Sequence, residues 1–191
     1  MRSFRFARFS AVILVSALYA SAASSQQSGA ARSELRAQTI VASFNKSKHV
    51  VKTKRGITKE KYLDVRSAPA VKANPADYSG TYEAADARFS LKLRVDASGK
   101  VEGTGYDLVS DDAAVSKSFT LRNGRLSGAL LTATKVYGDG SSEPLEGVFI
   151  NKTVFESPTD KGTTAFGLGV VGRQFQMDGM TIDRLFYEVK R

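Results

Sequence analysis

The chain of 191 residues contains no cysteine, no tryptophan and a single histidine, His49. Without cysteine it can form no disulfide, no thiolate metal site and no thiol nucleophile, and it offers no cysteine for a lipid anchor. One imidazole is too few for a multi-histidine zinc site and leaves one histidine base at most. No apolar run approaches the ~18 residues that a membrane-spanning helix needs. We therefore expect no cofactor, no metal site and no transmembrane segment in the mature chain.

The first 23 residues have the pattern of a secretory signal peptide. Three arginines precede an apolar stretch at residues 9–19, and small residues follow it. The apolar stretch is about half as long as a bilayer requires, which disfavours a membrane anchor. We expect cleavage near Ala22/Ala23 and export of the mature protein to the periplasm or the cell exterior.

The formal net charge of +9 is distributed unevenly. Residues 24–78 carry 11 basic and 4 acidic side chains, whereas residues 79–191 carry 14 basic and 15 acidic ones. The composition changes at the same place, from a polar segment to short apolar runs separated by glycine. We therefore divide the chain into a leader at 1–23, an N-terminal polar region at 24–78 and a folded domain at 79–191.

The polar region is predicted to contain one short helix followed by a basic arm. Ala37, Ile40, Val41 and Phe44 are spaced as one apolar stripe of a helix that begins near Ser33. Residues 67–78 hold two prolines among small residues and are interpreted as an extended linker.

The basic arm between helix and linker is a candidate site for an anionic partner. Aromatic side chains, which stack on bases, are sparse around it, so nucleic acid is disfavoured, and anionic components of a cell envelope fit an exported protein better. The alternative is a solvated arm that only spaces or covers the domain. The candidate residues are Lys46, Lys48, Lys52, Lys54, Arg55, Lys59 and Lys61.

The domain at 79–191 is predicted to be all-β. Residues 89–95 alternate strictly between apolar and polar side chains, which is typical of a strand with one face in water. Further runs of this kind are separated by turn residues, including an Asn123-Gly124 pair that predicts a hairpin turn. Counting the runs gives an antiparallel up-and-down meander of about eight strands that forms a small barrel.

Three glycines, Gly103, Gly128 and Gly147, follow an apolar residue at the same spacing and are expected to face inward, where strands of a small barrel bend. A barrel interior is the natural place for a small apolar ligand. The tentative lining residues are Leu91, Leu93, Leu130, Phe149, Phe166 and Phe186.

The triplet Gly80-Thr81-Tyr82 at the start of the meander resembles the lipocalin and calycin group. In that group a Gly-x-Trp triplet begins the first strand of an eight-stranded up-and-down barrel. Here Tyr82 stands in place of the tryptophan, and Arg184 is the nearest candidate for the family's late arginine. The resemblance implies a cup lined by apolar residues and a small hydrophobic ligand.

Motifs that would indicate catalysis or nucleotide binding lack their structural context. Residues 167–172 match G-x-G-x-x-G, but no helix pattern follows to hold a pyrophosphate, so we interpret them as a glycine-rich strand. No G-x-S-x-G elbow accompanies His49. Carboxylates cluster in two loops, and either cluster could serve hydrolysis or bind Ca²⁺, although neither has EF-hand spacing. They are Asp107, Asp111 and Asp112 in one loop and Asp139, Glu143 and Glu146 in the other.

The sequence therefore favours an exported, non-enzymatic β-barrel that binds a small apolar ligand or an envelope partner. One alternative is a structural or envelope-associated protein with a filled barrel, whose basic arm contacts anionic surfaces. A carboxylate-dependent hydrolase that uses Asp111 and Asp112 is the least favoured hypothesis.

Overall fold

The computed structural model describes residues 29–54, 57–84, 89–108, 116–177 and 180–190. The leader and its expected cleavage site lie outside these residues, as do Arg55, Asp111 and Asp112. Among the described residues, no helix is both long enough and apolar enough to cross a membrane.

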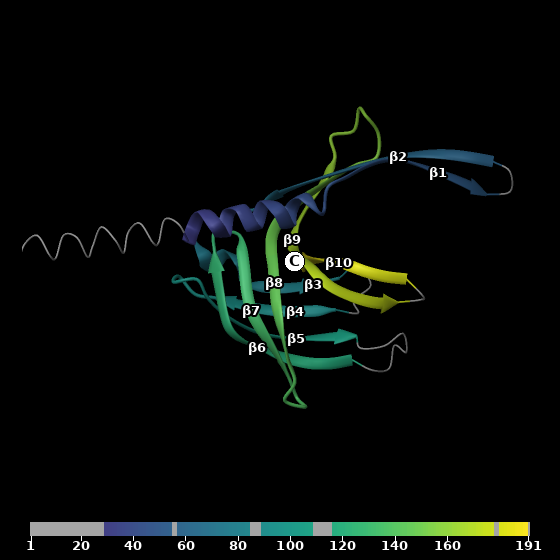
Figure 1. Cartoon of the computed structure of the whole chain (residues 1–191). Coiled ribbons are helices and arrows are strands. Elements are labelled where there is room, and N and C mark those ends of the chain that lie inside the picture. The colour runs from purple at the N-terminus through teal and green to yellow at the C-terminus, as the bar shows by residue number, and fades with distance from the viewer. Residues whose placement is uncertain (1–28, 55–56, 85–88, 109–115, 178–179, 191) are drawn as a thin grey trace, which may run out of the picture.

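The described residues form one α-helix, one short 3-10 helix and ten strands (Figure 1). The helix spans residues 29–42, so it starts earlier than the cap predicted at Ser33. Two strands and a 3-10 helix come next: β1 (Lys46–Lys54), β2 (Ile57–Pro69) and η1 (Pro75–Tyr78). The remaining strands are β3 (Gly80–Glu83), β4 (Ser90–Val95), β5 (Lys100–Leu108), β6 (Ser116–Ser127), β7 (Leu130–Tyr137), β8 (Ser142–Phe155), β9 (Thr163–Met177) and β10 (Met180–Val189).

Strands β3 to β10 form a closed antiparallel barrel, which confirms the predicted fold class. Each strand pairs with the next one along the chain. The ring closes where β10 pairs with β3, through Glu188 opposite Glu83 and Val189 opposite Tyr82. Eight strands enclose a space that side chains can fill or that one small ligand can occupy.

The inner face of this barrel is filled by side chains. In β4 the apolar residues Leu91, Leu93 and Val95 are buried while Lys92 and Arg94 between them are exposed, as the alternating pattern predicts.

Aromatic rings pack together inside the barrel, from Phe149 toward the end at which β3 begins. The rings of Tyr78 and Phe149 lie 4.5 Å apart between centroids, and those of Tyr82 and Phe149 lie 5.5 Å apart. All three residues are at most 1% exposed, so the centre of the barrel is a packed core and not a deep cup.

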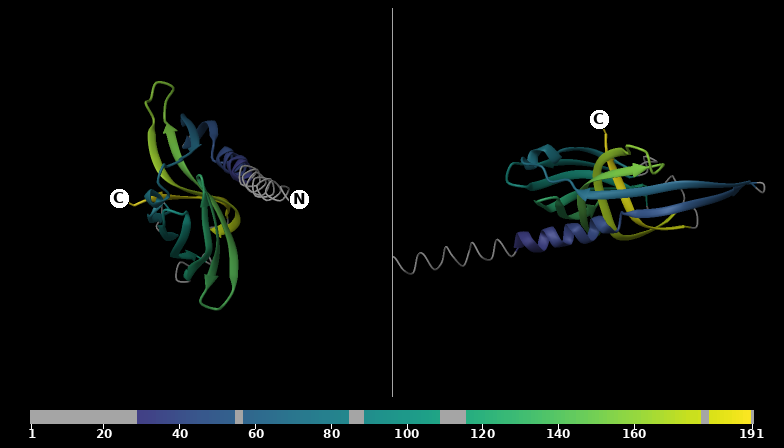
Figure 2. Two further views of the ribbon diagram at one scale, coloured as in Figure 1. Left: turned by 90° about the vertical axis from the view of Figure 1, so that its left-hand side faces the viewer. Right: turned by 90° about the horizontal axis from the view of Figure 1, so that it is seen from above.

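The apolar stripe of the helix packs on the outer face of β8 and β9. Ala37, Ile40, Val41 and Phe44 are all buried, as the spacing predicts. Gly169 of β9 makes the contact close, because a Cβ added there would lie 2.8 Å from the Phe44 ring. The helix therefore lies against the outside of the barrel wall and does not enter the barrel interior (Figure 2).

The Asn123-Gly124 pair is not a hairpin turn, contrary to the prediction. Strand β6 continues through it, and the pairing register with both neighbouring strands shifts there, which marks a β-bulge. Asn123 has φ 52°, a conformation that asparagine tolerates in bulges as well as in turns. The hairpin turn comes later, at Gly128, which has φ 60° and is therefore a turn glycine and not an inward one.

The residues interpreted as arm and linker belong to the sheet. Strands β1 and β2 form an antiparallel hairpin that projects from the barrel (Figure 1), and residues 64–69 of β2 pair with residues 150–155 of β8. The linker prediction was wrong for its first and last parts, since Ser67–Pro69 pair within the sheet and both Ala70 and Tyr78 are buried.

Truncating Phe44 should release the helix from the barrel. Phe44→Ala removes a ring that is 8% exposed and leaves a gap over Gly169, so we expect a loss of about 3 kcal/mol in the free energy of unfolding. Chemical denaturation measures it. Leu35→Ala, on the same helix but 66% exposed, is the matched control and should change stability by less than about 0.5 kcal/mol. Equal losses in the two variants would contradict helix docking through this stripe.

The helix is also joined to β8 by an ion pair, which should make its docking sensitive to acid. Arg36 donates to both Glu146 oxygens, at 2.9 and 2.5 Å, and this hydrogen bonding holds the pKa of the Glu146 carboxyl below its usual range. Because the Glu146 pKa is lower in the folded state, the ion pair stabilises the fold fully above the unfolded pKa of about 4.3. This stability is lost as the pH falls through the folded-state pKa. Glu146→Gln should therefore cost about 0.5–1 kcal/mol at neutral pH and almost nothing at the acid end of a pH series of denaturation curves. Glu188→Gln, on the exposed face of β10, is the control, and a cost for Glu146→Gln that did not shrink in acid would refute the ion pair's role.

Candidate functional site

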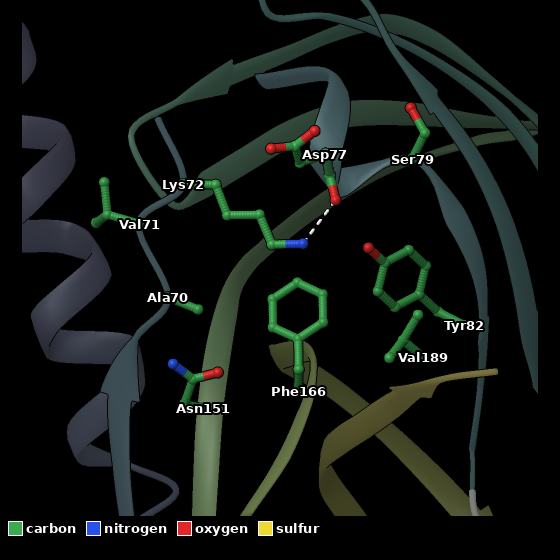
Figure 3. Close-up of a pocket in the computed structure, with 9 residues that line it drawn as sticks. All are labelled: Ala70, Val71, Lys72, Asp77, Ser79, Tyr82, Asn151, Phe166 and Val189. Atoms are coloured by element: carbon green, nitrogen blue, oxygen red, sulfur yellow. Dashed lines mark hydrogen bonds between the residues drawn. The ribbon is translucent and has the colours of Figure 1, made fainter. Parts of the chain in front are cut away.

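The cavity that we describe as the candidate site opens at one mouth of the barrel. It has a volume of about 450 Å³ and lies between the crossing segment at residues 70–72, the end of η1 and the adjoining ends of the barrel strands (Figure 3). This volume falls in the range of small-molecule sites. The lining residues are Ala70, Val71, Lys72, Asp77, Ser79, Tyr82, Asn151, Phe166 and Val189.

Tyr78 holds the crossing segment in place over the mouth. Its hydroxyl donates to the Ala70 carbonyl at 2.7 Å and accepts the Lys72 backbone N–H at 2.7 Å. The Ala70 N–H in turn donates to the Phe149 carbonyl of β8 at 2.8 Å. The Tyr78 hydroxyl therefore satisfies both the Ala70 carbonyl and the Lys72 N–H. Apart from these bonds, the segment at residues 70–72 joins the sheet only at its start, through the Ala70 N–H.

Both tyrosines at the mouth remain neutral and cannot act as bases at physiological pH. Burial raises the pKa of Tyr78, although the hydrogen bond from the Lys72 backbone partly opposes it. Burial also raises the pKa of Tyr82, far above its usual range, and Tyr78 adds to the effect. Tyr82 donates its proton to the Tyr78 carbonyl at 2.5 Å, which fixes its ring as part of the cavity wall.

Lys72 brings a positive charge to an aromatic wall. Its Nζ lies 4.1 Å from the centroid of the Phe166 ring and 5.2 Å from that of Tyr78, both within cation–π distance. The ammonium donates to the Asp77 carbonyl at 2.6 Å. Because an ammonium carries three protons, Lys72 can also donate to a ligand in the cavity. The cavity thus combines apolar walls with one positively charged donor (Figure 3).

The six residues expected to line the interior divide into three groups. Leu91, Leu93 and Phe149 face inward but are at most 4% exposed and belong to the packed core. Of the six, Phe166 alone lines the cavity at the mouth.

The other two, Leu130 and Phe186, were wrongly assigned to the interior. Leu130 pairs with Val148, and Phe186 pairs with Gly169, the glycine whose missing Cβ faces Phe44 of the helix segment. Paired residues share a face of the sheet, so both lie on the outer face. The error has a simple cause, because runs such as residues 129–131 and 148–150 are apolar on both faces and alternation cannot orient them.

The lysines of the basic arm lie on the hairpin β1–β2. Lys52 is opposite Lys59 in the register, and Lys46, Lys48 and Lys54 occupy the alternate positions of β1 on either side of Lys52. Lys61 lies two positions beyond Lys59 on β2, opposite Val50. Arg55 lies outside the described residues. A role for this hairpin in binding anions stays a prediction.

The two acidic clusters contribute to ion pairs in the described residues. Asp107 is fully buried and accepts from Lys135 Nζ at 2.7 Å and from the Tyr137 hydroxyl at 2.9 Å, while the same hydroxyl lies 3.2 Å from Glu143. One acid from each predicted loop therefore meets at Tyr137, inside the barrel end opposite the mouth.

The remaining described acids face outward. Asp139 pairs with Lys117 at 2.9 Å and also accepts from Ser141, and these hydrogen bonds hold its pKa far below the usual range. Glu146 pairs with Arg36. No cluster of three metal-ligating side chains occurs in the described parts of the chain.

The G-x-G-x-x-G stretch lies within β9, as the interpretation of a glycine-rich strand requires. A Cβ on Gly167 would lie 2.2 Å from the Tyr187 carbonyl of β10, so the glycine permits close strand contact. Arg184 is placed in β10 opposite Val171, and its side chain is not among those described.

Sequence reasoning missed the residues that form the mouth, above all Lys72 and Tyr78. Both fall in the segment interpreted as a linker, which is bonded to itself through the Tyr78 hydroxyl and is held on the barrel through Phe149 of β8. The available signal was Tyr78 itself, a large aromatic residue at the end of the short turn that Asn74 and Pro75 begin. Comparison of the chain with known protein families, curated proteins and solved structures gives no match.

Removing the Tyr78 hydroxyl should loosen the mouth. Tyr78→Phe leaves the Ala70 carbonyl and the Lys72 N–H without their partner, and we expect a loss of about 1–3 kcal/mol in the free energy of unfolding. Tyr82→Phe, which deletes a single donated bond, is the comparison and should cost less. Hydrogen exchange at the Lys72 amide should accelerate in Tyr78→Phe only. Unchanged exchange there would show that the phenol does not hold the segment.

Proposed function

We propose that this protein is an exported, non-enzymatic binding module whose lipocalin-like barrel takes a small amphipathic carboxylate at its mouth. The observation that carries the proposal is the position of the Lys72 ammonium above the Phe166 ring at the edge of a cavity of about 450 Å³.

The lining favours a ligand with an apolar body and one anionic end. Phe166 and Val189, both partly exposed, offer apolar surface, and burial of such surface drives the binding of small apolar groups. Lys72 offers charge-assisted hydrogen bonds to a carboxylate, and Asn151 at the rim adds an amide. The sequence predicts a small apolar ligand, and the cationic side chain at the cavity narrows this prediction to a small amphipathic ligand.

The packed interior limits the size of this ligand. Because Phe149, Leu91 and Tyr82 are at most 2% exposed, a long chain cannot pass into the barrel without displacing the core. Short aliphatic or aromatic acids fit the mouth alone.

The same packed interior favours a second candidate function. A filled barrel suits a structural or envelope-associated protein that makes its contacts outside the barrel, and the lysine-rich β1–β2 hairpin is the segment that the sequence offers for such contacts. This candidate predicts no small-molecule binding at the mouth.

A matched ligand panel tests the proposal. Octanoate and phenylpropionate, each paired with the corresponding alcohol and amine, are titrated against the purified protein by calorimetry and followed by amide chemical shifts. We expect the acids to bind more tightly than the alcohols, and the amines not to bind. Lys72→Met keeps the aliphatic stem but removes the charge and should weaken the acids by about tenfold or more, because a hydrogen bond to a charged group is worth ~1.5–3 kcal/mol.

Two further variants make the result specific. Phe166→Ala should weaken acids and alcohols alike, since it removes apolar wall. Lys161→Met removes a charge from an exposed loop and should have no effect. Binding that is insensitive to both Lys72→Met and Phe166→Ala, or no binding by any acid, would reject the mouth as a ligand site and favour the filled-barrel alternative.

A further inference from the structure

A second cavity lies on the outer wall of the barrel. It is a hollow of about 1070 Å³ over strands β4, β5 and β6, which run side by side at the lower edge of Figure 1. No aromatic residue lines it.

The hollow is strongly cationic, although residues 79–191 as a whole have a net charge close to zero. Lys92, Arg94, Lys100, Arg122 and Arg125 line it, against the single carboxylate of Glu102. Glu102 is paired with Lys100 at 2.7 Å.

The other four cations make no ion pair within the described part of the chain. The nearby Asp96 is occupied by its own turn, where its carboxylate accepts from the Ser98 hydroxyl and from the Lys100 N–H. Glu102 also lies opposite Arg94 in the register, so one carboxylate faces two cations and leaves a clear excess of exposed positive charge. This excess costs stability through mutual repulsion unless an anion binds.

The β-bulge at Asn123-Gly124 brings two of these charges to one face. In a regular strand, residues three apart point to opposite faces. Here the bulge inserts one residue, so Arg122 opposite Thr134 and Arg125 opposite Thr132 both lie on the outer face of β6. Gly124 is required for this arrangement, because a Cβ there would lie 2.2 Å from the Val101 carbonyl of β5.

We propose that the β4–β6 hollow binds a linear acidic polysaccharide through Lys92, Arg94, Arg122 and Arg125. Residues 79–191 carry 14 basic and 15 acidic side chains, so their net charge gives no sign of such a site. The structure shows that the opposite charges of the domain are separated in space.

The shape and lining of the hollow favour a single polyanionic chain. Three strands at a spacing of ~4.8 Å give a width of about 10 Å, which suits a single extended chain. Single-stranded nucleic acid needs aromatic platforms, and the lining has none.

A membrane surface is disfavoured on a separate ground. The apolar residues beneath the hollow, Leu93, Val101 and Leu121, are at most 5% exposed and have nothing to insert between lipids. Exposed Thr104 and Thr120, opposite each other and beside Lys92, add hydroxyls for hydrogen bonds to sulfate, carboxylate or sugar hydroxyl groups. The choice of a polysaccharide over nucleic acid also rests on the proposed export, but not on the ligand site at the mouth.

Binding of the full-length mature chain to defined polyanions tests the proposal. The probes are dextran sulfate and polygalacturonate, compared with a single-stranded oligonucleotide, duplex DNA and vesicles of anionic phospholipid, across a series of salt concentrations. Arg94→Gln/Arg122→Gln/Arg125→Gln should weaken polysaccharide binding by about tenfold or more and reduce the slope of log affinity against log salt by about 2, since each lost charge contributes ~0.7.

The matched control removes the same charge from the hairpin. Lys48→Gln/Lys52→Gln/Lys59→Gln should change polysaccharide affinity by less than about threefold if the binding site is the hollow. Lysine replacements at the three arginines keep the charge and should restore most of the affinity. Amide signals of β4–β6 in the unmodified protein should shift on titration with polygalacturonate, a readout that does not depend on the folding of any variant.

Several outcomes would overturn the proposal. Equal losses in the two triple variants would mean that net charge alone drives binding. Tighter binding of nucleic acid or vesicles than of either polysaccharide would assign a different partner. Shifts confined to the hairpin would move the site away from the hollow. None of these results depends on whether carboxylates bind at the mouth, so the two proposals fail independently.

Discussion

Closure of the barrel is the constraint on which the other features depend. An eight-stranded ring leaves an interior that one set of side chains can fill. The closing pair of β3 and β10 is short, with two residue pairs, and is reinforced by the Lys190 N–H, which donates to the Thr81 carbonyl at 2.8 Å, and by the Lys190–Glu83 ion pair at 3.0 Å. Once the ring is closed and filled, binding surfaces can exist only at its mouths and on its outer wall. Both proposed sites follow from this geometry.

The sequence predicts the barrel well because its main signals are local. Alternation in β4 and the apolar stripe from Ala37 to Phe44 each report which face of an element is buried, and the structure confirms both. The predicted number of strands was still right although Asn123-Gly124 was wrongly assigned as the turn, because the true turn lies only a few residues later. A turn and a bulge both need a residue that tolerates positive φ. Local chemistry cannot distinguish the two, because the difference lies in whether the neighbouring strand continues.

The candidate site could not be predicted, because no local pattern in the sequence marks its residues. Tyr78 makes its hydrogen bonds with Ala70 and Lys72, and its ring packs on Phe149, which is far away in the sequence. The segment carries the small residues and prolines that usually indicate a linker, and nothing local marks it as part of the fold. The charge of the outer wall was hidden in a similar way. The domain's acids are present in normal number, but Asp107, Asp139 and Glu146 pair with cations elsewhere, so the net charge conceals a surface where cations dominate.

The two ends of the barrel differ in a way that determines where a ligand can enter. Opposite the mouth, Lys135 and Asp107 form an ion pair whose side chains are 5% and 1% exposed, and Tyr137 joins it. Separating such a pair leaves a buried charge without its partner and costs several kcal/mol, about 3–5 in measured cases. A ligand that entered at that end would have to separate this pair. At the mouth, the segment at residues 70–72 is fixed chiefly by the hydrogen bonds of the Tyr78 hydroxyl and of the Ala70 N–H. This difference favours the Lys72 mouth as the entry point for the carboxylate proposed above, because the Lys72 ammonium lines the cavity at that end.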